Sequence, residues 1–71
     1  MQIDRVRLIA EMARQNMGNA KLSELSGVSC PAISAIRNGK RCYARTAQKL
    51  ADALGVSLEY LAGKEDRAIA Q

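Results

Sequence analysis

The chain contains few of the residues that catalysis and metal binding require. Its 71 residues include no histidine, tryptophan or phenylalanine, and only two cysteines, two tyrosines and one proline. Without histidine there is no imidazole for acid–base chemistry, and two cysteines alone do not complete a zinc site. The five glycines fit turns and helix ends, so no phosphate-cradling glycine loop remains. We therefore expect no enzyme, no metal, no cofactor and no small-molecule ligand.

Long hydrophobic runs are also missing. No apolar stretch approaches the ~18 residues of a membrane helix, and the segment around Asp4 and Arg5 is charged at once, unlike a signal peptide. We therefore expect no membrane contact and an intracellular protein. The length accommodates one domain, residues 1–63, followed by a polar tail at 64–71. With so few aromatic residues, aliphatic side chains must fill the core.

Basic residues are present in excess, and the excess is local. The chain has eleven Lys and Arg against seven Asp and Glu, a net charge of +4. Five of the basic residues and none of the acidic ones fall within residues 37–49. We call this set the basic stripe: Arg37, Lys40, Arg41, Arg45 and Lys49. Clustered positive charge is typical of a surface that binds nucleic-acid phosphates, although a solvated basic loop would give the same composition.

The spacing of apolar residues predicts an all-α domain of five helices, because alternating patterns and β-branched runs are nearly absent. The expected helices are 3–17, 20–26, a third from the cap Ser29 to Asn38-Gly39, 44–54 and 58–62. Asn19, Ser29 and Ser57 are the expected N-caps. The expected glycine terminators are Gly18, Gly27, Gly39, Gly55 and Gly63.

The same spacing predicts which side chains face the core. Along 3–17 the expected stripe is Ile3, Val6, Ala10, Ala13 and Met17, widened by Ile9 and Met12, with Arg5, Glu11 and Arg14 outside it. Elsewhere we expect Leu22, Leu25, Val28, Ile33, Ile36, Ala47, Leu50, Ala51 and Leu54 to face inward.

Two short amphipathic segments flank Gly27-Val28-Ser29, which is the layout of a helix-turn-helix. Residues 19–61 resemble the lambda-repressor-like family of the Cro/cI or XRE type. The residues that carry the resemblance are Leu22, Gly27-Val28-Ser29, Ile33-Ser34, Ile36, Asn38-Gly39-Lys40, Leu50-Ala51, Ala53-Leu54-Gly55-Val56-Ser57, Leu58 and Leu61.

The resemblance implies a compact five-helix domain that binds double-stranded DNA. Family members are mostly phage repressors, bacterial regulators and antitoxins, so a bacterial cytoplasmic location is implied. Many bind pseudo-palindromic operators as homodimers, with the third helix in the major groove. Since some members instead bind a toxin, an antitoxin-like protein-interaction module is the alternative function.

The resemblance also assigns candidate site residues. The implied base-reading set is Cys30, Pro31, Ala32, Ser34, Ala35 and Arg37. The implied DNA-backbone set is Asn19, Ser29, Asn38, Lys40, Arg41, Tyr43 and Arg45. The implied dimer interface is Thr46, Leu58 and Tyr60. The base-reading set is poor in hydrogen-bonding groups before Arg37, which indicates methyl contacts, Ser34 and DNA shape as the means of discrimination.

Several roles stay open at this stage. Family members often carry Glu at position 37, buried against an Arg that aligns with Met12, so Arg37 either swings outward to DNA or pairs with an acid such as Glu11. Tyr43 either donates its hydroxyl to a phosphate or covers the start of the following helix. Leu58 is either core or interface. Position 19 is more often Gln in the family, and Asn donates the same bond over a shorter reach.

The two cysteines are expected to be reduced thiols, with Cys42 partly buried. A second interpretation of Cys30 is a redox switch, since it lies at a helix N-terminus beside a basic surface.

Overall fold

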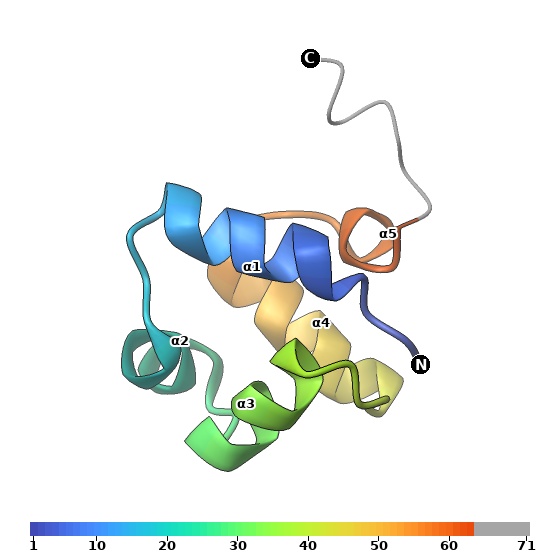
Figure 1. Ribbon diagram of the computed structural model, residues 1–71, viewed down its shortest axis with the longest axis horizontal. Helices are drawn as coiled ribbons and strands as arrows, with labels where there is room; N and C mark the ends of the chain where they lie inside the picture. The colour runs from blue at the N-terminus through green and yellow to red at the C-terminus, as the bar shows by residue number, and fades with distance from the viewer. Residues whose placement is uncertain (64–71) are drawn as a thin grey trace.

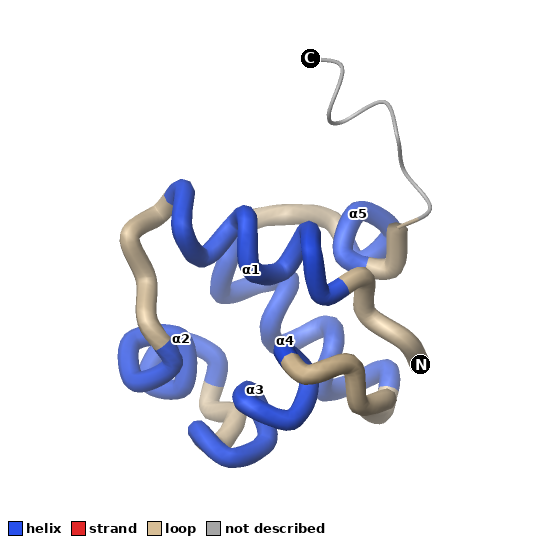
Figure 2. The backbone as a smooth tube through the Cα atoms, viewed as in Figure 1, coloured by secondary structure: helices blue, strands red, loops and turns tan. Residues whose placement is uncertain are grey.

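Five helices follow one another in the computed structural model, which describes residues 1–63 (Figure 1). They are α1 (Arg5–Arg14), α2 (Asn19–Ser26), α3 (Cys30–Arg37), α4 (Ala44–Leu54) and α5 (Leu58–Leu61). The described part of the chain contains no strand (Figure 2), so the all-α prediction is confirmed. The tail expected at 64–71 lies outside the described residues.

Short-range capping sets most of the helix ends. The Ser29 hydroxyl accepts from the Ala32 amide at 3.3 Å, and the Ser57 hydroxyl accepts from the Tyr60 amide at 3.1 Å. Gly27 and Gly55 end α2 and α4 in the left-handed conformation, with φ of 79° and 73°, where a side chain would be strained. The predicted N-caps of α3 and α5 and the predicted glycine ends of α2 and α4 are therefore confirmed.

The ends of α1 differ from the prediction. Asp4 is its N-cap and accepts from the Val6 amide at 3.0 Å, so Ile3 lies before the helix rather than in its first turn. At the other end, Asn16 takes the left-handed conformation with φ of 55°, while Gly18 is extended. Asn tolerates that conformation through its short polar side chain, and the chain therefore turns two residues before the expected glycine.

The buried face of α1 also differs from the prediction. Val6 is 68% exposed, and Ala10 and Ala13 are exposed as well. Met12 is buried as predicted, and the other buried side chains of α1 are Leu8 and Glu11, which the prediction did not include. Both faces of this helix have apolar residues at helical spacing, and packing selects the face with the longer side chains because it removes more apolar area from water.

Two further assignments on α2 are wrong. Leu25 is 51% exposed rather than inward-facing. The N-cap of α2 is Gly18, which forms no side-chain cap, and Asn19 is the first helical residue. The Asn19 side chain is therefore free of the capping role that the sequence suggested, and it bonds elsewhere.

Aliphatic side chains from all five helices form one core, in which α4 packs against α2 and α5 while α1 packs against α3 and α5. Its buried hydrophobic residues are Ile3, Leu8, Met12, Leu22, Val28, Ile33, Ile36, Ala47, Leu50, Ala51, Leu54 and Leu61. The four inward residues predicted on α4 are all among them. In the described part of the chain, no helix is long and apolar enough to cross a membrane.

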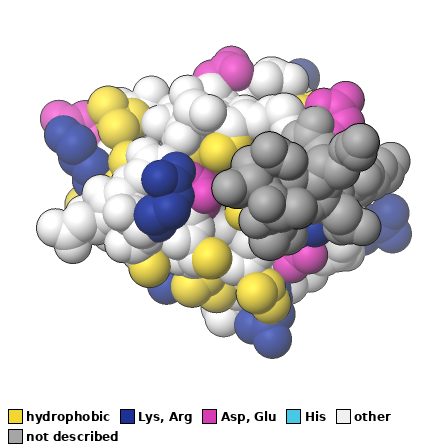
Figure 3. Space-filling view, turned by 90° about the horizontal axis from the view of Figure 1, so that it is seen from above, with side chains coloured by type: hydrophobic (Ala, Val, Ile, Leu, Met, Phe, Trp, Pro, Cys, Tyr) yellow, Lys and Arg dark blue, Asp and Glu magenta, His cyan; other side chains and the backbone are white. Residues whose placement is uncertain are grey.

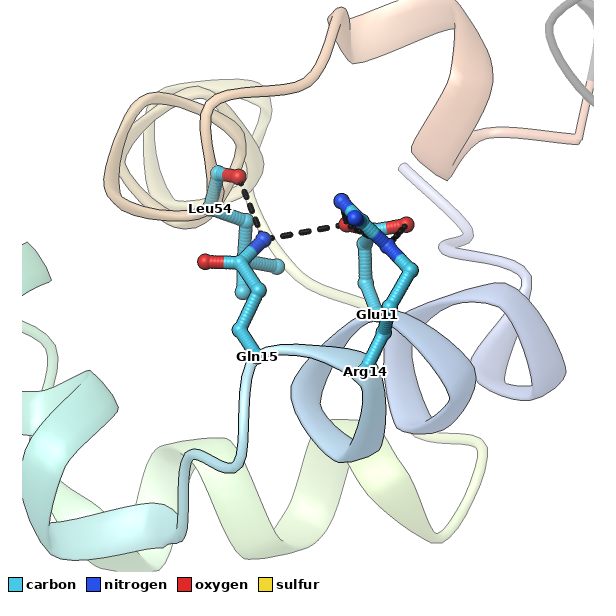
Figure 4. Close-up of polar contacts among 4 residues, drawn as sticks. All are labelled: Glu11, Arg14, Gln15 and Leu54. Atoms are coloured by element: carbon cyan, nitrogen blue, oxygen red, sulfur yellow. Dashed lines mark hydrogen bonds and ion pairs between the residues drawn. The ribbon is translucent and has the colours of Figure 1, made fainter.

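Glu11 is a charged residue inside this packing, only 6% exposed. Its carboxylate accepts from Arg14, whose Nε lies 3.1 Å from Oε1, and from Gln15 Nε2 at 3.0 Å (Figure 4). The Gln15 amide also donates to the Leu54 carbonyl at 2.7 Å. The Arg14 hydrogen bond is the main cause that lowers the pKa of Glu11, against the opposing effect of burial. This network joins the end of α1 to the end of α4.

Candidate nucleic-acid interface

The turn of the helix-turn-helix is held by a buried side chain and by side-chain hydrogen bonds. Val28 is buried in the turn between α2 and α3. The Ser26 hydroxyl donates to the Leu22 carbonyl at 2.6 Å and accepts from the Val28 amide at 3.1 Å. Since α2 packs against both α3 and α4, the direction of α3 is fixed relative to the rest of the core.

One face of α3 is turned away from that core. Ile33 and Ile36 are buried, while Cys30, Pro31 and Ser34 are exposed. Ala32 and Ala35 are half-buried beside them. The exposed face thus offers methyl groups, a hydroxyl and a thiol, and no long polar side chain before Arg37. Its chemistry suits contact with thymine methyls better than bidentate recognition of a purine.

Two of the expected base readers and three of the expected backbone contacts line a hollow beside α3. Its volume is about 530 Å³, and its lining includes Ala32, Ala35, Lys40, Arg41, Tyr43 and Thr46. Residues predicted for three separate roles therefore lie on one continuous surface. Lys40 and Arg41 line its edge and are exposed to solvent.

The N-terminal segment holds the loop that carries these basic residues. The Cys42 amide donates to the Met1 carbonyl at 2.9 Å, and Gln2 Nε2 donates to the Gly39 carbonyl at 3.0 Å. On its other side, the Lys40 amide donates to the Ala35 carbonyl at 3.0 Å. The sequence gives no sign of this support, because the partners are about forty residues apart and neither segment is a helix or a strand.

Tyr43 and Arg45 form a pair at the start of α4. Tyr43 is 72% exposed, and the Arg45 guanidinium carbon lies 5.2 Å from the centre of its ring. A guanidinium over an aromatic face is a stabilising cation–π arrangement. The aromatic ring therefore contacts the side chain of Arg45, which belongs to the first turn of α4, while most of the Tyr43 surface is exposed.

Arg37 takes neither of the two positions considered for it. Its Nη1 donates to Asn19 Oδ1 at 2.7 Å, which joins the last turn of α3 to the first residue of α2. Glu11 is occupied by Arg14 and Gln15 and does not pair with Arg37. The guanidinium is part-buried and bonded to an amide oxygen instead of to an acid.

A second, smaller hollow of about 290 Å³ lies between α1 and α3. Ser34, Arg37 and Asn38 line it together with Ile9 and Arg5. Arg5 was absent from the residues that the sequence assigned to the site. Arg5 comes there because it is the first residue of α1, which packs on α3, so no local pattern identifies it.

The opposite side of the molecule has a different distribution of charge. Seen from above α1, Lys and Arg side chains are dispersed among Asp and Glu rather than gathered (Figure 3). The charge excess lies in residues 37–49, from the last residue of α3 into the first half of α4.

The residues expected at a dimer interface occupy different surroundings. Thr46 is half-buried and lines the larger hollow. Leu58 and Tyr60 are half-buried and pack against the edge of the core. The Arg7 guanidinium lies 4.9 Å from the centre of the Tyr60 ring, and its Nη1 donates to the Tyr60 carbonyl at 3.1 Å. An interface through Tyr60 would therefore include Arg7.

Both cysteines are free thiols. Cys30 is exposed and Cys42 half-buried, as predicted, and burial raises the pKa of the Cys42 thiol. No group of three His, Cys, Asp or Glu side chains that could hold a metal ion occurs within residues 1–63.

Comparison with known proteins gives one family. The model of the Cro/C1-type HTH DNA-binding domain matches residues 7–64, which is most of the chain and includes all of α2 to α5. No curated protein and no solved structure matches the chain. The matched family is a DNA-binding domain and not an enzyme family. The helix-turn-helix, its exposed α3 face and the basic residues beside it agree with that match, and the chain belongs to the Cro/C1-type HTH DNA-binding domain family.

Proposed function

We propose that the protein is a sequence-specific transcription regulator of bacterial or phage origin that acts in the bacterial cytoplasm. It binds a pseudo-palindromic operator as a homodimer, with α3 in the major groove of each half-site. The observation that carries the proposal is the continuity of the α3 face with the hollow lined by Lys40 and Arg41. A repressor role follows if the bound dimer excludes RNA polymerase from the promoter.

In this proposal the two sets of contacts have separate tasks. Backbone contacts set the register of the protein on the duplex without reading its sequence. They are made by Asn19, Ser29, Asn38, Lys40, Arg41, Tyr43 and Arg45. Sequence is read by Cys30, Pro31, Ala32, Ser34 and Ala35, chiefly through thymine methyls and the Ser34 hydroxyl. Arg45, held over the Tyr43 ring, supplies a charge for a narrow minor groove.

Dimerisation adds the affinity that one small reading face lacks, since a single half-site buries little surface. Thr46, Leu58 and Tyr60 form the proposed contact between subunits. We propose α5 as the centre of this contact because its half-buried side chains Leu58 and Tyr60 leave apolar surface at the edge of the core.

The deciding experiment is selection from a pool of random duplex DNA at moderate salt, followed by sequencing of the bound fraction. A two-fold symmetric motif with half-sites about one helical turn apart supports the proposal. Enrichment without a motif would indicate a backbone binder and would remove the specific-regulator role. Failure to retain DNA would leave the antitoxin-like alternative, which the poverty of polar side chains on α3 favours.

Salt dependence separates the same alternatives quantitatively. Each phosphate neutralised adds about −0.9 to the slope of log affinity against log salt. Removing Lys40 and Arg41 together should therefore reduce the steepness of that slope by about 1.8. A slope unaffected by the double substitution would mean that these charges do not contact the backbone.

A further inference from the structure

Arg37 is a cation without an acid partner in the described chain. It is half-buried, and its Nη1 donates to Asn19 Oδ1 at 2.7 Å. Its Nε is buried and has no hydrogen-bond partner. The ion pairs at the described carboxylates Asp4, Glu11 and Glu24 are made with Arg7, Arg14 and Lys21. The Arg37 guanidinium is thus half-buried, and the partner that accepts its hydrogen bond, the Asn19 amide, is neutral.

This bond determines how the Asn19 amide is turned. A guanidinium only donates hydrogen bonds, so the Asn19 atom that faces it must be the carbonyl oxygen. The Asn19 NH₂ group therefore points away from Arg37, with both of its N–H groups available to another acceptor.

The surroundings of that NH₂ group favour an anion. Asn19 is the first residue of α2, and the N-cap Gly18 provides no side-chain acceptor for the first-turn amides. A helix N-terminus carries partial positive charge and stabilises anions. The Arg37 cation lies against the same helix end, which is unfavourable until negative charge arrives. One phosphate oxygen would accept from the amide and lie near both positive groups.

We propose that Arg37 is a positioning residue for DNA binding: it holds Asn19 Oδ1 so that the Asn19 NH₂ group donates to a backbone phosphate. This inference rests on the proposed function, and it gives Arg37 a role other than reading a base. To reach a base edge, Arg37 would have to release Asn19. Asn19 is shorter than the Gln that the family more often has at this position. The hydrogen bond from Arg37 orients the Asn19 amide and so compensates for its shorter reach.

The test is a double-mutant cycle on DNA affinity with Asn19→Ala, Arg37→Met and the double variant. Lys49→Met, which removes a charge from exposed α4 surface, is the matched control. We expect each single variant to weaken binding about tenfold, the effect of losing a hydrogen bond to a charged group. In the Asn19→Ala background, Arg37→Met should weaken binding no more than Lys49→Met does. Multiplicative losses would show that Arg37 contacts DNA directly and would overturn the inference.

Sequence preference gives a second, independent readout. Arg37→Met should weaken the selected operator and an unrelated duplex by the same factor, because a phosphate contact carries no sequence information. A changed preference at one base position would assign Arg37 to base reading instead. Circular dichroism at the assay temperature verifies that the variants are folded, and Arg37→Gln replaces Arg37→Met if the latter is not.

The outcomes also separate this inference from the proposed function. If the unsubstituted protein binds no duplex, the proposed function fails. If it binds and the cycle is multiplicative, only the role of Arg37 fails.

Discussion

Glu11 offers a sharp test of how charge is held inside this small fold. The substitution Glu11→Gln keeps the size of the side chain and one acceptor oxygen, but it removes the charge that Arg14 and Gln15 contact. Hydrogen bonds to charged groups are worth about 1.5–3 kcal/mol each. The Arg14 side chain is 67% exposed, so solvent screens its part of the interaction. We therefore expect a loss of about 1–2 kcal/mol in the free energy of unfolding at pH 7.

The pH dependence of that loss has a definite sign. The pKa of Glu11 is lower in the folded protein than its ordinary value of 4.5, chiefly because of the Arg14 hydrogen bond. The unfolded chain therefore binds the proton more readily, and the stabilisation is complete above pH 4.5. It disappears as the pH falls through the lower, folded-state pKa. Gln does not titrate, so the two proteins should approach the same stability in acid.

Urea unfolding followed by circular dichroism measures this difference at constant ionic strength, at pH 7 and at steps below pH 5. Glu24→Gln is the matched control, because Glu24 pairs with Lys21 on the surface and both side chains are well exposed. We expect a control effect of about 0–0.5 kcal/mol. A gap between wild type and Glu11→Gln that persists or widens in acid would refute the reasoning.

The remaining predictions address packing, the basic surface and assembly. Leu22→Ala should cost about 2–5 kcal/mol in unfolding free energy, and Leu25→Ala less than about 1, since only Leu22 is fully buried; equal losses in urea unfolding would contradict the packing. Tyr43→Phe should weaken DNA binding less than Tyr43→Leu in a titration, because Phe loses only the hydroxyl and Leu also loses the ring that supports Arg45; equal losses would mean that the ring contributes nothing. Tyr60→Ala should raise the dimer dissociation constant in sedimentation, and an unchanged constant excludes that contact.

The sequence predicted α3 and α4 well because their ends depend on neighbouring residues. Ser29 accepts from an amide three residues along, and Gly55 supplies the left-handed turn that α4 requires. All the residues that form such a cap lie within one helical turn of each other in the sequence. The inward positions of α4 followed as well, since one face of that helix is apolar and the other is polar.

The sequence did not predict the buried face of α1 correctly, because two faces of this helix carry apolar residues at helical spacing. Val6, Ala10 and Ala13 form one apolar stripe, and Leu8 and Met12 lie on a second one, of which the prediction included only Met12. Contacts with α3 and α5, distant in sequence, select the second stripe. That choice also buries Glu11, a residue that the periodicity had placed outside the core, and the cost of burying it is offset by Arg14 and Gln15.

In the candidate site, too, some features could be predicted from the sequence and others could not. The exposed residues of α3 follow from the helix-turn-helix spacing, since Ile33 and Ile36 must face the core. The bond from Arg37 to Asn19 does not follow, because residues eighteen apart meet only after α2 and α3 have packed. The N-terminal support of the basic loop is likewise a tertiary feature, with Met1 and Cys42 forty-one residues apart.

The composition of α3 places a requirement on the rest of the molecule. Methyl groups and a single hydroxyl discriminate bases only when their position in the groove is well defined, because they lack the reach of Arg or Gln. The position of α3 must therefore be fixed by residues outside its exposed face. The buried Ile33 and Ile36 fix α3 against the core. The bonds at Cys42 and Gly39 hold the following loop, and the bond from Arg37 to Asn19 joins α3 to α2. Specificity in this protein is thus expected to be sensitive to substitutions that touch no base.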